Sequence, residues 1–597
     1  MWFVWLACTP KAPTVVPPGA AVPGQDPPAA AGVRSQALAA VLTEHWEATL
    51  QRYPEWATNL GDHRYDDQVS DPSEAARAAW LSREQEWATR LSLLQDSALT
   101  SADRETRDLL LESLRADVGA EVCRTLLWSV SARANALVDV NTLSDDASVA
   151  TPEDGARLVA RYRAAAASID TQTRNLGAGG DRVANLDSLN KVVEMLDREL
   201  GSPVADAPML GPARVEHPEW DPAALATFRA DLTAAVTDGV RPALTRYRDL
   251  LRDQLVPKGR TGADIGLHAL PDGDACYRAL IRQETTLDLT PDELHQTGLD
   301  ELAKIHAEFR VLGKAVLGTD DLAEIFARLR SDPALHFGTA DEVKATAEAA
   351  LRRAEAAVPR FFGTVPRAPC TVDAIPDYLA PYTTVAYYQQ ARPDGTRPGV
   401  YFVNVFAPET RPRHEAEVLA FHESVPGHHL QIAIAQERGE LPAFRRYGGA
   451  TAFVEGWALY GERLANEMGL YTGDTDRLGM LAFDSWRAAR LVVDTGLHAK
   501  GWTREQAEAF VLENTPLAEN NIVNEVDRYV TTPGQALAYK TGQLEILALR
   551  AEAEAALGPS FSLPAFHDVV LSGGAVSLPV LRRRVQAWID TAGDLRQ

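Results

Sequence analysis

The stretch HESVPGHHLQ, from His422 to Gln431, brings three histidines and a glutamate close together. In zinc hydrolases, a His-Glu pair and a second His on the same helix face bind Zn²⁺, and the Glu polarises the metal-bound water. The usual spacing places the second His at i+4, but here Pro426 occupies that position. His428 stands at i+6 and His429 at i+7, and neither shares an ion with His422 on a straight helix.

Pro426 and Gly427 change this geometry. Proline lacks an N–H and clashes with the carbonyl four residues earlier, so we expect the helix to bulge or break there. Gly427 tolerates backbone angles that other residues resist. A two-residue bulge would bring His428 to the place of an i+4 histidine. Two histidines beside a simple Pro-Gly kink are the alternative.

A third ligand is expected from FVEGWALYGERL, from Phe453 to Leu464. A zinc site with two His ligands usually takes a carboxylate from a second element and leaves one position open for water. Glu455 is the candidate, because Gly456 beside it lets two helix backbones approach closely. Glu462, seven residues later on the same face, is expected to hydrogen-bond a ligand. A solvated face of an amphipathic helix is the alternative.

Most of the remaining sequence carries the start and stop signals of helices. Helix starts are predicted at four threonines: Thr151, Thr290, Thr503 and Thr532. At Thr290, proline follows at the first helical position and Glu293 is placed to cap the helix in return. Long helices are expected over 294–312 and 535–557, the second ended by Gly558.

One region departs from this pattern, between Val365 and Phe406. It contains many prolines and the stretches YTTVAYY and VYFVNVF, whose aromatic and β-branched residues predict a hairpin or small sheet. We therefore expect a mainly α fold with a small β-sheet just before the metal-site helix. Residues 33–260 are predicted to form an N-terminal helical lobe, and 261–597 a C-terminal lobe of catalytic type.

Composition narrows the class of partner. The chain has 597 residues, of which 46% are hydrophobic, and a formal net charge of -24. This acidic balance argues against a nucleic acid as the main ligand. A mean hydropathy of -0.19 and the lack of a long apolar run argue against a membrane-spanning helix. A metal or a peptide remains compatible with the charge, and the sequence leaves the oligomeric state open.

The N-terminus is typical of an exported lipoprotein. Cys8 follows the apolar stretch MWFVWLA and precedes a Pro- and Ala-rich segment, so residues 1–32 are predicted to be a leader and flexible tether. We expect a lipid on Cys8 as the only membrane attachment, and a place in the cell envelope or periplasm. The basic residues usual in such a leader are missing, which leaves a cytoplasmic location as the alternative.

The other cysteines are widely spaced. Cys123, Cys276 and Cys370 form no CxxC pair and no disulfide framework that spacing would reveal. We expect all three to be small buried hydrophobic residues.

HESVPGHHLQ and VEGWALYGERL together resemble the bacterial domain-of-unknown-function 885 family (DUF885), many of whose members are lipoproteins. The likeness extends over most of the chain after the tether. It includes YPEWATNLGDHRYDD near Tyr53, RPGVYFVNVF near Tyr401, VVDTGLHAKGWT near Asp494 and DRYVTTPGQALAYKTG near Tyr529. The resemblance implies a large two-lobed helical body, similar to gluzincin metallopeptidases such as the angiotensin-converting enzyme and Taq carboxypeptidase groups.

Carried over by position, the resemblance implies His422, His428 and Glu455 as zinc ligands and Glu423 as the general base. His428 is preferred because Gly427-His428 matches the Gly-His that ends comparable motifs. His429 is the fallback ligand, or a neighbour of the substrate.

Two groups of residues are candidates for proton and charge chemistry. Tyr529 and Tyr539 are candidate donors to the oxyanion that develops during peptide hydrolysis. His498 lies one helical turn after Asp494, which is expected to hold it in one tautomer. A structural His at a helix end is the alternative.

Three further residues are candidates for substrate binding. Arg528 and Lys540 are expected to hold the C-terminal carboxylate of a peptide, although surface salt bridges are the common fate of such residues. Asn404, with Phe402 and Val403, is expected to form an edge strand along which an extended peptide lies.

These residues predict a zinc-dependent hydrolase, a metallopeptidase that cleaves oligopeptides through a Glu-activated zinc-bound water. Two alternatives stay open. One is a non-catalytic envelope lipoprotein that binds a peptide or a metal. The other is an amidase or esterase that uses the same activated water.

Overall fold

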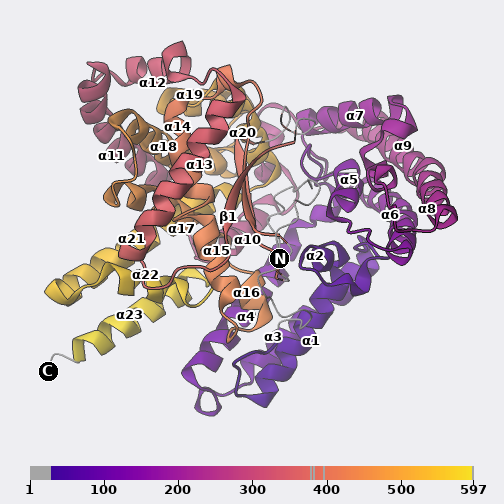
Figure 1. The fold of residues 1–597 in the computed structure, drawn as a ribbon, viewed down its shortest axis with the longest axis horizontal. Coiled ribbons are helices and arrows are strands. Elements are labelled where there is room, and N and C mark those ends of the chain that lie inside the picture. The colour runs from indigo at the N-terminus through magenta and orange to yellow at the C-terminus, as the bar shows by residue number, and fades with distance from the viewer. Residues whose placement is uncertain (1–28, 377–379, 381–383, 394, 396, 595–597) are drawn as a thin grey trace.

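The structure is a computed structural model that describes residues 29–594, except 377–379, 381–383, 394 and 396. Cys8 and most of the predicted leader and tether therefore lie outside the described residues. The expectation of a mainly α fold is confirmed, since helices dominate the described chain (Figure 1). Within that part of the chain, no helix is long and apolar enough to span a membrane.

The first half of the chain is helical from residue 36 onward. Its helices are α1 (Gln36–Arg52), α2 (Pro54–Asn59), α3 (Glu74–Ser92), α4 (Ser101–Ala120), α5 (Ala136–Asp146), α6 (Pro152–Gly177), α7 (Leu186–Gly201), α8 (Pro222–Ala234) and α9 (Arg241–Leu250). Helices α5 to α9 form a group of their own at the right of Figure 1. They enclose a separate hydrophobic core, in which Tyr162 and Tyr247 are fully buried.

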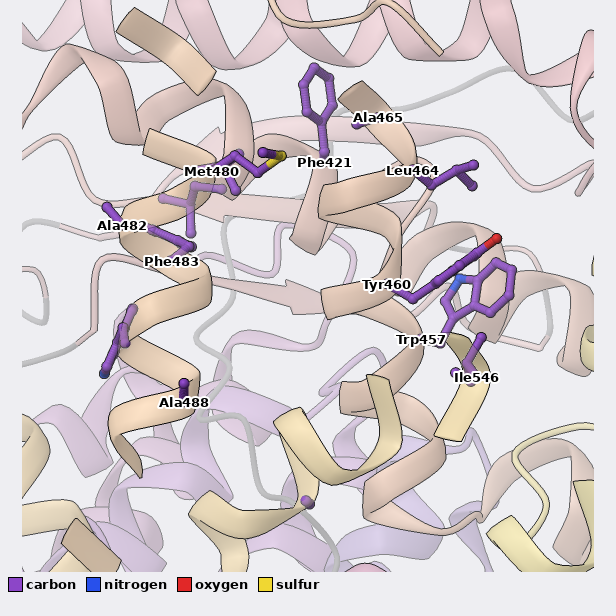
Figure 2. Packing of buried hydrophobic residues seen from close by; sticks show 14 of the residues in the cluster. Phe421, Trp457, Tyr460, Leu464, Ala465, Met480, Ala482, Phe483, Ala488 and Ile546 are labelled. Atoms are coloured by element: carbon purple, nitrogen blue, oxygen red, sulfur yellow. The ribbon is translucent and has the colours of Figure 1, made fainter. Parts of the chain in front are cut away.

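The second half contains the larger core. Its helices are α10 (Gly273–Thr285), α11 (Pro291–Leu317), α12 (Leu322–Ser331), α13 (Ala340–Ala357), α14 (Arg413–Glu423), α15 (His428–Glu437), α16 (Ala443–Tyr447), α17 (Thr451–Glu467), α18 (Asp474–Ala499), α19 (Arg504–Asn514), α20 (Glu519–Thr531), α21 (Ala538–Leu557), α22 (Leu563–Leu571) and α23 (Leu578–Asp594). Figure 2 shows Phe421, Trp457 and Phe483 in this core, which therefore surrounds the motif helices α14 and α17. The predicted lobe boundary at 260–261 stays a prediction.

The small sheet appears where the sequence predicts it. Its strands are β1 (Cys370–Ala374), β2 (Ala386–Gln389) and β3 (Gly399–Val403), in the order β1-β3-β2. β3 pairs in parallel with β1 and antiparallel with β2. The prediction of an edge strand at Phe402 and Val403 is wrong, because both sides of β3 are already hydrogen-bonded to neighbouring strands.

Three of the four predicted helix starts are confirmed. Thr151, Thr290 and Thr503 each form a capping box with the residue three positions later. Thr532 instead follows the last residue of α20, and α21 begins only at Ala538. The reason is tertiary: Gly534 takes a left-handed conformation, and its N–H donates to the buried carboxylate of Asp494.

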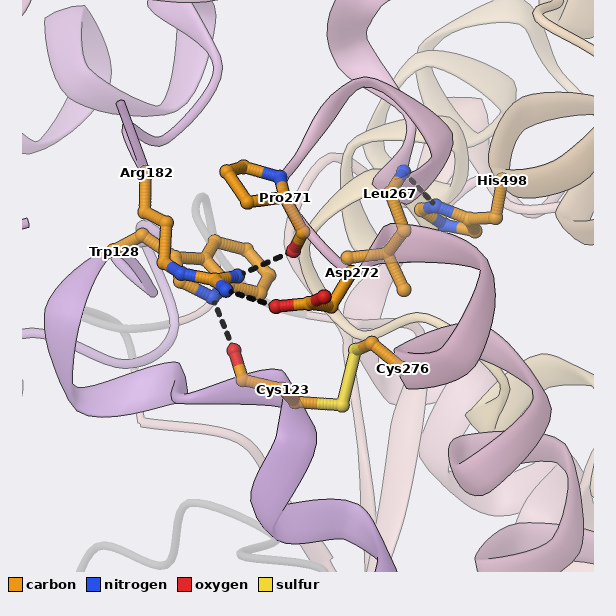
Figure 3. Close-up of a disulfide and its surroundings, with 8 residues drawn as sticks. All are labelled: Cys123, Trp128, Arg182, Leu267, Pro271, Asp272, Cys276 and His498. Carbon is orange, nitrogen blue, oxygen red and sulfur yellow. Dashed lines mark hydrogen bonds and ion pairs between the residues drawn. A yellow bond between two sulfur atoms is a disulfide. The ribbon is translucent and has the colours of Figure 1, made fainter. Parts of the chain in front are cut away.

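The cysteine prediction needs a correction. Cys123 and Cys276 are buried, as expected, but they form a disulfide with a Cα–Cα distance of 4.7 Å (Figure 3). Their separation of 153 residues hides the pairing, which depends on α10 packing against the end of α4. Cys370 is a free thiol and only partly buried.

Candidate metal centre

The chain breaks, rather than bulges, within the motif. α14 ends at Glu423 and α15 begins at His428, so the two histidines start from different helices. A Cβ on Gly427 would lie 1.9 Å from the carbonyl oxygen of His422, so this tight return requires glycine. The indole N–H of Trp457 donates to the carbonyl of Pro426 at 2.9 Å and holds the connection against α17.

This break brings three buried side chains together. One ligand atom each from His422, His428 and Glu455 lies within 4.8 Å of the others, a group that could hold a metal ion. The Oε2 atom of Glu455 is 3.8 Å from Nε2 of His422 and 3.4 Å from Nε2 of His428. All three residues are less than a tenth exposed. Since buried polar atoms usually have partners, this convergence indicates a site made for a ligand.

Glu462 orients the first histidine, as predicted. The Nδ1–H of His422 donates to Oε1 of Glu462 at 2.7 Å, which directs Nε2 toward His428 and Glu455. Burial lowers the pKa of His422, but the carboxylates of Glu455 and Glu462 outweigh it and raise the pKa to about 9. Arg487 lies 3.6 Å from the same Glu462 oxygen and balances part of this negative charge.

His429 does not join the group. Its Nε2 is 3.0 Å from the carbonyl of Ala368, to which it donates, and its Nδ1 accepts from the hydroxyl of Tyr388 at 3.0 Å. Burial also lowers its pKa to about 4. With both nitrogens engaged, His429 is a structural residue, and the geometry selects His428.

Close helix packing places Glu455. A Cβ on Gly456 would lie 2.5 Å from the Cα of Gly542 in α21, so the two helices approach as the sequence predicts. Glu455 and Glu462 share the face of α17 that points at α14 and α15. Helix α17 is thus held by the Gly456–Gly542 contact with α21 on one side and by α14 and α15 on the other.

A cavity of about 880 Å³ lies between the two halves of the chain, and its lining does not include these three residues. Glu415 and Leu419 of α14 line it, and Glu423 continues their helix face one turn further on. Tyr401 of β3 also lines the cavity. Burial and the negative charge of Glu423 raise the pKa of Tyr401 well above its usual range, which indicates that the two side chains are neighbours.

The family follows from the whole chain. A model of bacterial proteins of unknown function, DUF885, matches residues 54–585. The chain belongs to the DUF885 family. A comparison with curated proteins found no match.

Two solved structures are similar to this chain over most of its length. A "putative lipoprotein" from Colwellia psychrerythraea is 28% identical, with a TM-score of 0.87 over 93% of this chain and 99% of that one. A second "putative lipoprotein of unknown function", from Shewanella oneidensis, is 19% identical, with a TM-score of 0.69 over 92% and 98% of the two chains. The second likeness shows the fold alone.

In this DUF885 protein, His498 is held by the backbone and not by Asp494. Its Nδ1 accepts from the N–H of Leu267 at 3.1 Å (Figure 3), and its Nε2 donates to the carbonyl of Tyr529 at 2.9 Å. The carboxylate of Asp494 instead accepts from the hydroxyl of Tyr277 at 2.6 Å. The expected Asp494–His498 pair is wrong, because tertiary partners satisfy both side chains.

The hydroxyl groups of Tyr529 and Tyr539, the two predicted oxyanion donors, differ in how tightly they are hydrogen-bonded. Tyr529 is buried, and its hydroxyl accepts from the indole of Trp486 at 2.9 Å and from Nε of Arg490 at 3.0 Å. Tyr539 is 7% exposed, and its hydroxyl lies at the longer distances of 3.5 Å from Arg528 and 3.4 Å from Gln535. Neither hydroxyl lies within hydrogen-bonding distance of the three-residue group.

The substrate-binding candidates also separate. Arg528 lines the cavity, as substrate binding requires. Lys540 is 2% exposed, and its ammonium donates to Asp484 at 2.7 Å and to Gln543 at 2.8 Å, so it cannot meet a substrate carboxylate. Asn404 also lines the cavity, but its side chain is 1% exposed and its amide donates to the carbonyls of Ala380 and Thr384, which makes it part of the fold.

Sequence reasoning missed Tyr401. Its hydroxyl is buried and has no hydrogen-bond partner among the described residues. The aromatic and β-branched residues of VYFVNVF predict a strand, but they do not show which side chain faces Glu423. That information comes only from the position of β3 beside α14.

Proposed function

We propose that this protein is a zinc-dependent peptidase. The observation that carries the proposal is the convergence of His422, His428 and Glu455. Two imidazoles and one carboxylate are a common ligand set for Zn²⁺ in hydrolases. Such a set leaves one coordination position of the zinc open for water. Glu455 Oε2 has no hydrogen-bond partner among the described residues, as expected of an oxygen reserved for a cation. When bound, zinc supplies an acidified water and polarises a carbonyl.

The chain's own residues supply the rest. Glu423, beside the ligand His422 and at the end of the cavity face of α14, accepts the proton of the attacking water and passes it to the leaving amine. The hydroxyl of Tyr401 donates to the oxygen of the scissile carbonyl as negative charge builds there. Glu462 keeps the imidazole of His422 in the tautomer that binds metal.

An oligopeptide is the proposed substrate. The cavity lies between the two halves of the chain. Its volume of about 880 Å³ is too small for a folded protein. Its walls are partly apolar, with Phe337, Val343 and Leu419, and partly charged. An extended peptide presents both kinds of surface to such walls.

The test is Glu423→Gln. Hydrolysis of a mixed, quenched fluorescent peptide library should fall by about 10²–10⁴-fold, because the base is lost while the ligands remain. Zinc content, measured by elemental mass spectrometry, should stay at the wild-type value and serves as the control. Wild-type hydrolysis should stop with a chelator and return with zinc. Equal hydrolysis by the variant would contradict the mechanism.

We also propose the cell envelope as the compartment. The similar structure from Colwellia psychrerythraea is described as a "putative lipoprotein", and the Cys123–Cys276 disulfide is of a kind that persists in oxidising compartments. Membrane fractionation with mass spectrometry of the N-terminus should find a lipid on Cys8. An unmodified Met1 end in a cytoplasmic fraction would contradict this.

A further inference from the structure

A second feature of the cavity is an arginine with nothing to bind. Arg133 lines the wall formed by the N-terminal half of the chain and is exposed to the cavity. Its backbone N–H donates to Ser131, but its guanidinium makes no hydrogen bond or ion pair with any described residue. A guanidinium carries five N–H donors, and a planar anion satisfies them best.

Arg528 lies on the same cavity, from the C-terminal half. Its Nη2 donates to Glu525 at 3.0 Å, while its Nη1 makes only long contacts of 3.3 Å and 3.5 Å with Gln535 and Tyr539. Its Nε has no partner among the described residues. Much of the binding capacity of this guanidinium is therefore unused.

The local charge is positive. Glu525 is the carboxylate nearest to this pair, and Arg490 already binds it at 2.9 Å. Arg133 and Arg528 line the same cavity, and burial together with the positive charge of Arg528 lowers the pKa of Arg133. Asp527, also on the wall, is paired with Lys191 and Arg504. Arg490 and Arg528 thus share one carboxylate, and the Arg133 guanidinium has no carboxylate of its own among the described residues.

Helix α18 connects this positive region to the metal centre, because Arg490 binds Glu525 and Arg487 lies beside Glu462. Arg490 follows Arg487 by three residues on α18, so their side chains are about 5–6 Å apart at Cβ. Arg487 reaches Glu462, which binds His422. Arg528 and the α14 residues Glu415 and Leu419 line the same cavity, so a peptide bound there lies along both.

We propose that Arg133 and Arg528, from opposite walls of the cavity, bind a carboxylate of the substrate. This inference rests on the proposed peptidase function. The carboxylate comes either from the C-terminus of a short peptide or from an Asp or Glu side chain. Each arginine contributes from a different half of the chain, so the bound anion also ties the two halves together.

The experiment measures binding without turnover. In the Glu423→Gln background, dansyl-labelled Ala-Ala-Ala is titrated as the free acid and as the C-terminal amide, together with dansyl-Ala-Glu-Ala amide. The free acid should bind about 10-fold tighter than the Ala amide or more, since bonds to charged groups are strong. Arg133→Gln should remove that preference and leave binding of the amide unchanged.

The controls separate charge from folding. Arg198→Gln removes a cation from the same cavity wall, but one whose guanidinium already binds Glu194, and it should keep the preference. Arg133→Lys should retain part of it. Because binding is measured, an absence of hydrolysis in the wild type would contradict only the peptidase, not the anion site.

The outcomes are distinct. Tight binding of the acid alone assigns the site to a C-terminal carboxylate, and equally tight binding of the Glu-containing amide assigns it to an acidic side chain. Equal affinity for all three peptides would overturn the proposal. So would an unchanged acid preference in both Arg133→Gln and Arg528→Gln.

Discussion

Two sets of buried polar side chains lie in the same core and differ in how their hydrogen bonds are used. At the metal centre, Glu455 Oε2 has no hydrogen-bond partner among the described residues. In the second set, His498 uses both ring nitrogens, and Lys540 binds Asp484 and Gln543. All of these residues are less than a tenth exposed.

The difference separates function from structure. A buried polar atom without a partner costs about 1–3 kcal/mol, so an unpaired carboxylate oxygen beside two imidazoles is expected where a ligand completes its bonds. A saturated group stabilises the fold and has no capacity left for a substrate. Substitutions at the metal centre should therefore reduce metal binding or activity, whereas substitutions in the second set should reduce stability.

The largest stability effect is expected at Lys540→Met. The change leaves Asp484 buried with one partner fewer, which should lower the free energy of unfolding by about 3–5 kcal/mol. Urea denaturation measures this. Zinc content of the folded fraction should match the wild type, and a stable variant without peptidase activity would instead make Lys540 a functional residue.

Tyr401→Phe should affect activity and not stability. Loss of the proposed donor should reduce kcat by about 10²–10³-fold. The hydroxyl has no described partner, so its removal should leave the urea midpoint unchanged or higher. An unaltered kcat would exclude Tyr401 from the reaction.

Glu462→Gln should weaken metal binding without abolishing it. The amide no longer holds the His422 imidazole by a charged bond, so zinc affinity should fall by about 10–100-fold. Competition with a chromophoric chelator measures this. Glu467→Gln, on the same helix but paired with Arg550 at the surface, is the matched control and should bind zinc as the wild type does.

The smallest effect concerns pH. Burial lowers the pKa of His498 to about 3, so the folded state keeps it neutral while the unfolded state takes up a proton below about pH 6.5. The unfolded state then binds more protons, and stability is lost as pH falls from about 6.5 toward 3. In His498→Gln, the loss between pH 6.5 and 5.5 should shrink by up to about 1 kcal/mol. If the free energy of unfolding from urea denaturation falls with pH as steeply in His498→Gln as in the wild type, His498 does not take up a proton on unfolding.

Local patterns were enough to predict the parts of the site that depend on neighbours in sequence. The break at Pro426, the role of Gly456 and the seven-residue step from Glu455 to Glu462 all follow from helix geometry. The sheet before the motif and three helix caps follow in the same way. The preference for His428 rested on a resemblance, and the bonds of His429 now support it.

Distant partners account for what the sequence could not reveal. His498 is fixed by Leu267, which lies 231 residues earlier, and Cys123 pairs with Cys276 across 153 residues. The central position of β3, which removes the expected edge strand, depends on β1 joining it in parallel. Patterns of neighbouring residues in one sequence carry no information about contacts between residues so far apart.

Metal content tests the central claim most directly. Wild-type protein, His428→Ala and His429→Ala are incubated with zinc, desalted and measured by elemental mass spectrometry. We expect about one zinc per chain in the wild type and in His429→Ala, and almost none in His428→Ala, because His428 faces Glu455 and His429 binds the carbonyl of Ala368 instead. A metal-free wild type, or zinc retained by His428→Ala and lost by His429→Ala, would contradict the account.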